Sequence, residues 1–152
     1  MKNDTCCVVT CDLPLDQTYW DNQYLADATG WAASQVSGGP ATGAAVSGEY
    51  QVTAVSAASR PIGYSSFPVQ SGKAYLASAK IRKDAAASTN AKFVASNDAT
   101  NANGPVAGSA LIGSTSLTQV PNRTFGPMVG VSTMFAGVLA QSGTATGMWA
   151  ID

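Results

Sequence analysis

Apolar and polar residues alternate with a period of two along much of the chain from residue 31 onward. Residues 49–55 (EYQVTAV) follow this pattern, and so do residues 74–82, where Tyr75 and Ile81 fall on the same face. Successive side chains of a β-strand point to opposite sides, so this period is typical of strands with one buried face. It predicts a fold built from β-sheets.

Turn-forming residues divide the rest of the chain into further short strands. Residues 38–43 contain three glycines and a proline and are expected to form a loop. The remaining strands are predicted at 61–67, 92–96, 110–112, 116–120, 128–132, 134–139 and 147–152. Many short strands at regular spacing are typical of a sandwich. We therefore predict an all-β fold, a single β-sandwich jelly roll over residues 29–152.

Residues 1–28 differ from the rest and are predicted to be an extended N-terminal arm. Within them, residues 15–28 also come close to helical spacing, so one short helix is the alternative. The arm contains five of the nine acidic residues of the chain. It also contains large side chains that we expect to anchor it on a partner, namely Tyr19, Trp20, Tyr24 and Leu25. The competing interpretation is that the arm is the first strand of the domain itself.

The composition indicates a small core and little catalytic chemistry. The 152 residues suffice for one domain, and only 11% of them are charged, against roughly 25% in an average protein. Alanine supplies much of the 45% hydrophobic content. We expect some large side chains to be buried between subunits, with a homotrimer favoured. There is no histidine, which removes the commonest general base, so we predict no catalytic residues and no enzyme activity.

The charge of the chain and its cysteines limit the kinds of partner and cofactor that we expect. The net charge of −1 argues against nucleic-acid binding, which needs a basic face. A basic run at residues 80–83 could meet an acidic partner or simply solvate a strand end. Cys6, Cys7 and Cys11 make neither a disulfide framework nor a zinc site, and no cofactor is predicted. The sequence shows no signal peptide and no apolar run long enough to cross a membrane, so we expect synthesis in a cytoplasm and no membrane partner.

Three segments together resemble a known type of domain. They are Gly30-Trp31, the stretch FPVQSGKAY at residues 67–75, and the final MWAID at residues 148–152. This order is similar to the carbohydrate-binding-module type of β-sandwich jelly roll, which also occurs in phage head-fibre, tail-fibre and decoration proteins. In such modules the last strand usually continues beyond the Ile-Asp pair, whereas this sequence stops at Asp152.

The resemblance implies that exposed aromatic residues stack on sugar rings. The candidates for glycan binding are Trp31, Tyr50, Tyr64 and Trp149. Each of them could instead be a core or interface aromatic, because the chain has few other large apolar residues. The resemblance also places Asp152 where such modules often hold calcium, and Asp98 lies in an oxygen-rich loop. The question of a bound metal stays open.

Two functions follow from these observations. The leading hypothesis is a non-enzymatic bacteriophage virion protein, a head-decoration, head-fibre or tail-fibre component that attaches through its arm to capsid or tail proteins. Its location would then be the virion. The alternative is a carbohydrate-binding module that recognises a glycan, for example on a host surface, through exposed aromatics.

Overall fold

The computed structural model describes residues 29–38, 41–55, 58–97, 107–121, 123–125, 129–141 and 144–152. All regular secondary structure in these segments is β-strand. Within them there is also no helix of the length and apolarity that crossing a membrane requires. The predicted arm, its anchor residues Tyr19, Trp20, Tyr24 and Leu25, and the three cysteines lie outside the described residues.

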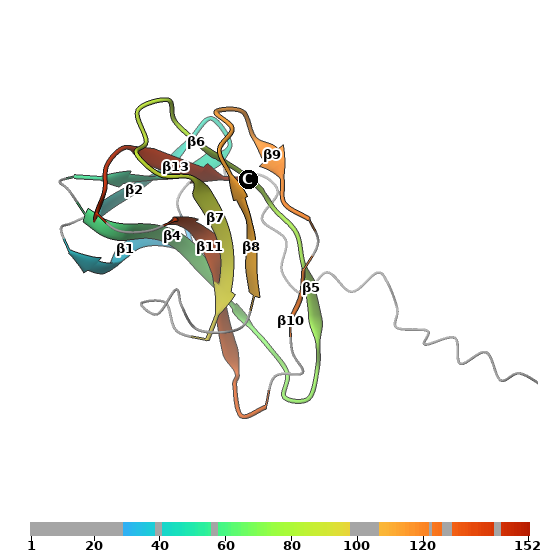
Figure 1. Cartoon of the computed structure of the whole chain (residues 1–152). Coiled ribbons are helices and arrows are strands. Elements are labelled where there is room, and N and C mark those ends of the chain that lie inside the picture. The colour runs from blue at the N-terminus through green and yellow to red at the C-terminus, as the bar shows by residue number, and fades with distance from the viewer. Residues whose placement is uncertain are drawn as a thin grey trace, which may run out of the picture.

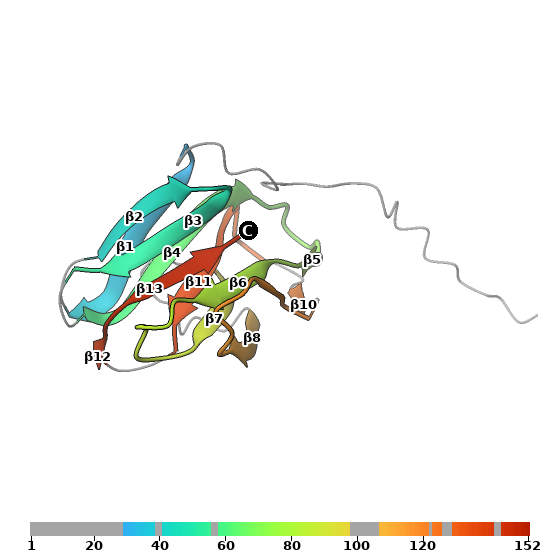
Figure 2. The same cartoon turned by 90° about the horizontal axis from the view of Figure 1, so that it is seen from above.

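The strands form two antiparallel sheets that pack face to face (Figures 1 and 2). The first sheet has the order β1 (Trp31–Gly38), β4 (Ala58–Pro68), β11 (Thr133–Ala140), β7 (Ala91–Ser96) and β8 (Ala107–Ile112), with β12 (Thr144–Ala145) also paired to β4. The second has the order β2 (Ala41–Val46), β3 (Glu49–Ala54), β13 (Met148–Ile151), β6 (Lys80–Lys83) and β9 (Thr118–Gln119). A separate two-stranded ribbon joins β5 (Tyr75–Ala77) to β10 (Arg123–Phe125). The prediction of an all-β sandwich is confirmed.

The core lies between the two sheets and is built around one tryptophan. Trp149 of β13 has no exposed surface, and its indole Nε1 donates a hydrogen bond to the carbonyl oxygen of Thr89 at 3.1 Å. Met134 and Val138 of β11 and Ile81 of β6 are fully buried in the same cluster. Many of the other buried residues of this cluster are alanines, in agreement with the composition.

A stacked aromatic pair fills one side of the core. The rings of Trp31 and Tyr50 lie 4.9 Å apart at an interplanar angle of 25°. Two glycines make room for Tyr50: a Cβ on Gly43 would collide with its hydroxyl, and a Cβ on Gly63 would come within 3.0 Å of its ring. Gly43 lies in β2, where it pairs with Val52 of β3. The prediction of a loop at this residue is wrong.

The turn between β2 and β3 fixes the register of the second sheet at its edge. It has two central residues, Ser47 and Gly48, with φ angles of 53° and 82°. Positive φ at both positions is the signature of the tight hairpin turn whose twist matches that of the strands. As a result Val46 pairs with Glu49 directly across the turn.

Two strand predictions need correction. Residues 74–82 were predicted as one strand, but the chain leaves the ribbon after Ala77 and enters the second sheet at Lys80. Tyr75 and Ile81, which were predicted to share one face, are nevertheless both buried. The strand predicted at 128–132 is wrong, since residues 129–132 are not in a strand. Of these four, Ser132 still accepts a backbone hydrogen bond from Val69 at 3.0 Å.

Candidate functional site

A second hydrophobic cluster lies on the face of the first sheet that is turned away from the second sheet. Ile62, Val94 and Leu139 are buried there, and Tyr64 packs against them. They belong to the same strands as the core residues but point to the opposite side, because side chains alternate along a strand.

Tyr64 forms an aromatic pair with Phe135 on this face. The two rings meet edge to face, with centroids 5.6 Å apart and an interplanar angle of 84°. Both residues are half-buried and retain exposed surface. The ladder neighbours of Tyr64 are Ala32 in β1 and Gly137 in β11. Since neither neighbour has a side chain larger than a methyl group, the Tyr64 ring has no bulky residue beside it in its own row. We call this surface the aromatic face.

Polar residues border the aromatic face. Ser66 lies opposite Phe135, and Ser34 lies opposite Ile62. On the other side Lys92 of β7 pairs with Leu139 and, across the next ladder, with Leu111, whose side chain is 44% exposed. The surface thus combines aromatic rings with hydroxyl groups and an amine. Such a mixture can stack on the apolar side of a sugar and hydrogen-bond to its hydroxyls.

The structure separates the four glycan-binding candidates. Tyr64 lies on the aromatic face, whereas Tyr50 and Trp149 are core residues with 2% and 0% exposure. Trp31 is partly buried and stacks on Tyr50. Burial raises the pKa of the Tyr50 phenol, and the nearby phenol of Tyr64 adds to this shift. Three of the four aromatics therefore belong to the packing between the sheets.

Sequence reasoning missed Phe135, the partner of Tyr64. A signal for it was present in the alternation of residues 133–140. Met134, Ala136 and Val138 point into the core, so Phe135 had to point outward if the strand was regular. A phenylalanine at an outward position of a central strand is a candidate for binding.

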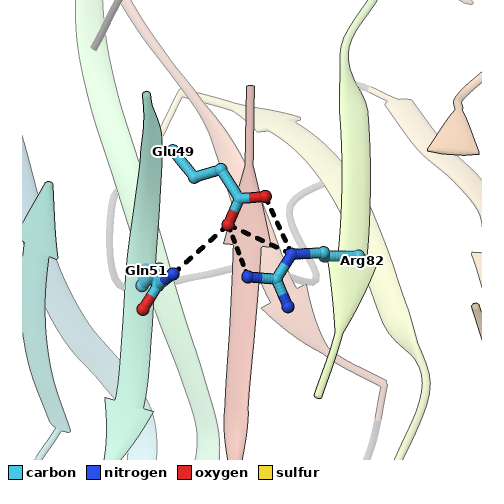
Figure 3. Close-up of polar contacts among 3 residues, drawn as sticks. All are labelled: Glu49, Gln51 and Arg82. Atoms are coloured by element: carbon cyan, nitrogen blue, oxygen red, sulfur yellow. Dashed lines mark hydrogen bonds and ion pairs between the residues drawn. The ribbon is translucent and has the colours of Figure 1, made fainter. Parts of the chain in front are cut away.

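The outer face of the second sheet carries an ion pair that joins β3 to β6 across β13 (Figure 3). Arg82 donates from Nε to Oε1 of Glu49 at 2.8 Å and from Nη2 to Oε2 at 2.6 Å. Gln51 adds a hydrogen bond from its Nε2 to Oε2 at 3.3 Å. The hydrogen bonds from Arg82 are the main reason why the pKa of Glu49 lies below its ordinary value of 4.5. Ala150, which lies between Gln51 and Arg82 in the sheet, is fully buried.

We expect this ion pair to stabilise the fold at neutral pH. Replacing Arg82 by alanine would leave the Glu49 carboxylate, whose side chain is only 13% exposed, with Gln51 as its remaining partner among the described residues. We therefore expect a loss of about 2 kcal/mol in the free energy of unfolding. Because folding lowers the pKa of Glu49, its contribution is present above pH 4.5 and disappears as the pH falls through the lowered value. Urea titrations of the wild-type protein and of Glu49→Gln at several pH values measure this directly.

The neighbouring pair of Lys80 and Asp152 is the matched control. Their charged atoms lie 3.5 Å apart, and the Lys80 side chain is 53% exposed. Lys80→Ala should therefore cost less than about 1 kcal/mol. Equal losses for Arg82→Ala and Lys80→Ala, or a stability difference between wild type and Glu49→Gln that does not shrink in acid, would contradict the assignment.

These contacts account for the basic run at residues 80–83. Lys80 and Arg82 pair with acidic side chains, and Lys83 donates from Nζ to the carbonyl oxygen of Ala87 at 2.9 Å. Each of the three cations has a partner within the domain. Among the described residues no group of three or more His, Cys, Asp or Glu side chains could hold a metal ion. Asp98 lies outside them.

Comparisons with known proteins address the fold. No protein-family model and no curated protein matches the sequence. A solved structure described as "CBM4 structure and function" is similar to this chain with a TM-score of 0.51 and 14% sequence identity, over 80% of this chain and 82% of the other. At this identity the likeness concerns the fold alone. It confirms, at the level of the fold, the resemblance to a carbohydrate-binding module and gives no support to the phage-fibre context.

Proposed function

We propose that this protein binds a carbohydrate through the aromatic face. The observation that carries the proposal is the pair of Tyr64 and Phe135, two partly exposed aromatic rings on the outward side of a sheet. The solved structure with a similar fold is, by its description, a carbohydrate-binding module. The face also has serine hydroxyls at its border, which suit the hydroxyl groups of a sugar.

Substitution of Tyr64 tests this proposal. Tyr64→Ala is expected to lower the affinity for a saccharide at least about tenfold, because an aromatic anchor contributes much of the energy at a binding site. A glycan array would find the ligand, and isothermal titration would measure the affinity. Phe135→Ala should weaken binding as well, whereas Tyr64→Phe keeps the ring and should bind nearly as the wild type does.

Leu76→Ala provides the control for these variants. Leu76 is 65% exposed but lies on the ribbon of β5 and β10, away from the aromatic face. Its replacement should leave binding unchanged. Full affinity of a folded Tyr64→Ala protein, with folding verified by circular dichroism, would overturn the proposal.

The role in a phage virion, expected first from the sequence, stays a prediction. It rests on the composition and on the arm, and the aromatic face adds nothing to it. The homotrimer and the lack of enzyme activity stay predictions as well. Sedimentation of the full chain at micromolar concentration would test the homotrimer, and sedimentation together with capsids would test the virion role.

A further inference from the structure

The strands of the first sheet carry basic residues and no acidic residue. The six strands of the first sheet contain two charged residues, Arg60 and Lys92, and both are basic. In the second sheet Lys80 and Arg82 are paired with acidic side chains. Within these six strands, the charged residues that could act on a ligand of the aromatic face are therefore both cations.

Lys92 is the cation whose position is best suited to a ligand on this face. Its ammonium group makes no hydrogen bond or ion pair with the described residues. Its ladder partners Leu139 and Leu111 are apolar and cannot neutralise the ammonium group. Arg60 is already engaged in an interaction of its own, so the argument rests on Lys92.

The register gives the separation between Lys92 and the aromatic pair. Lys92 lies opposite Leu139, and Leu139 lies opposite Ile62, two residues before Tyr64. With strands about 4.8 Å apart and a rise of about 3.4 Å per residue, the Cα of Lys92 is about 10 Å across and about 7 Å along the sheet from that of Tyr64. Ile62 and Leu139, which lie between the two residues in the register, are buried. Lys92 would therefore contact a different unit of the oligosaccharide from the one that stacks on Tyr64.

We infer that the saccharide bound by the aromatic face is acidic, and that Lys92 contacts its carboxylate. This inference rests on the proposed function and adds the class of ligand to it. The ammonium group recognises the carboxylate by charge, while Tyr64 and Phe135 stack on the sugar ring. The chain as a whole has a net charge of −1, so general attraction to a polyanion would not produce such a preference.

The test compares acidic polysaccharides with their neutral counterparts. The probes are polygalacturonate, alginate and hyaluronan, each also in a form whose carboxyl groups are methyl-esterified. The full chain should bind at least one acidic form about threefold to tenfold more tightly than its ester, with an affinity that falls as salt is added. Affinity gel electrophoresis measures both effects.

Lys92→Gln is the decisive variant, and Lys73→Gln is its matched control. Lys73 is exposed in the turn that precedes β5. We expect Lys92→Gln to bring the affinity for the acidic form down to that for the ester, while Lys73→Gln changes neither. Equal binding of both forms, or an acid preference that persists in Lys92→Gln, overturns the inference.

The two proposals fail in different ways. If the wild type binds only neutral saccharides and Tyr64→Ala abolishes that binding, the proposed function stands and the acidic ligand is excluded. If the wild type binds neither the acidic forms, nor the esters, nor any member of a glycan array, both proposals are overturned.

Discussion

Replacing Trp149 by alanine is expected to lower the free energy of unfolding by about 3–5 kcal/mol. Trp149 has no exposed surface and sits in the cluster between the two sheets. Its removal would leave a cavity and an unpaired carbonyl at Thr89, which now accepts the indole hydrogen bond at 3.1 Å. This loss is a large part of the roughly 5–15 kcal/mol by which a typical domain is stable. Urea denaturation followed by fluorescence of the remaining tryptophans measures it.

A milder substitution keeps this prediction testable if the alanine variant does not fold. Trp149→Phe retains an aromatic ring but loses the indole N–H, so we expect a smaller loss of about 1–3 kcal/mol. It should leave saccharide affinity unchanged, because Trp149 lies inside the core. A folded Trp149→Phe protein with wild-type stability but much weaker binding would instead assign Trp149 to the ligand.

The second large effect is expected for Gly137→Ala. Gly137 lies in β11, between Tyr64 of β4 and Val94 of β7. A Cβ at this position would collide with the backbone oxygen of Gly63 and come within 2.7 Å of the Cα of Tyr64. Backbone atoms of a paired strand cannot move aside as a flexible side chain can. We therefore expect a loss of about 3 kcal/mol and displacement of Tyr64 from its place on the aromatic face.

Gly113→Ala is the control for this substitution. A Cβ on Gly113 would come within 3.1 Å of the side-chain oxygen of Asn90, which can rotate away. The expected cost is below about 1 kcal/mol. Thermal unfolding and saccharide titration of both variants distinguish a collision with the backbone at Gly137 from a contact with a movable side chain at Gly113. Similar melting temperatures for Gly137→Ala and Gly113→Ala would show that β11 and β4 tolerate the added methyl group.

The class of fold could be predicted from local sequence patterns. Alternation of polar and apolar residues in segments such as 49–55 requires no knowledge of distant contacts, because the two sides of a strand differ in exposure wherever the strand lies. Small residues weaken this signal. The strand at residues 41–46 was missed because Gly43 indicates a turn in isolation, whereas in the folded protein it makes room for the ring of Tyr50.

The break at residues 78–79 shows a second limit of local patterns. The alternation from Tyr75 to Ile81 is regular, and both residues are buried as predicted. Whether that stretch pairs with one neighbour or with two depends on distant strands. Here β10 and β13 take the two halves separately. The local alternation of polar and apolar residues does not depend on which distant strand a segment pairs with, so it cannot predict the pairing.

The sequence by itself determined that this chain forms strands and that these strands build a sandwich; that aromatic residues bind a ligand is a prediction from the resemblance. Only the tertiary structure decided which aromatics serve which purpose. Trp31 and Tyr50 stack in the core, Trp149 is buried between the sheets, and Tyr64 meets Phe135 on the outward face. The physical reason is that the period of a strand defines two faces but does not tell which one the other sheet will cover.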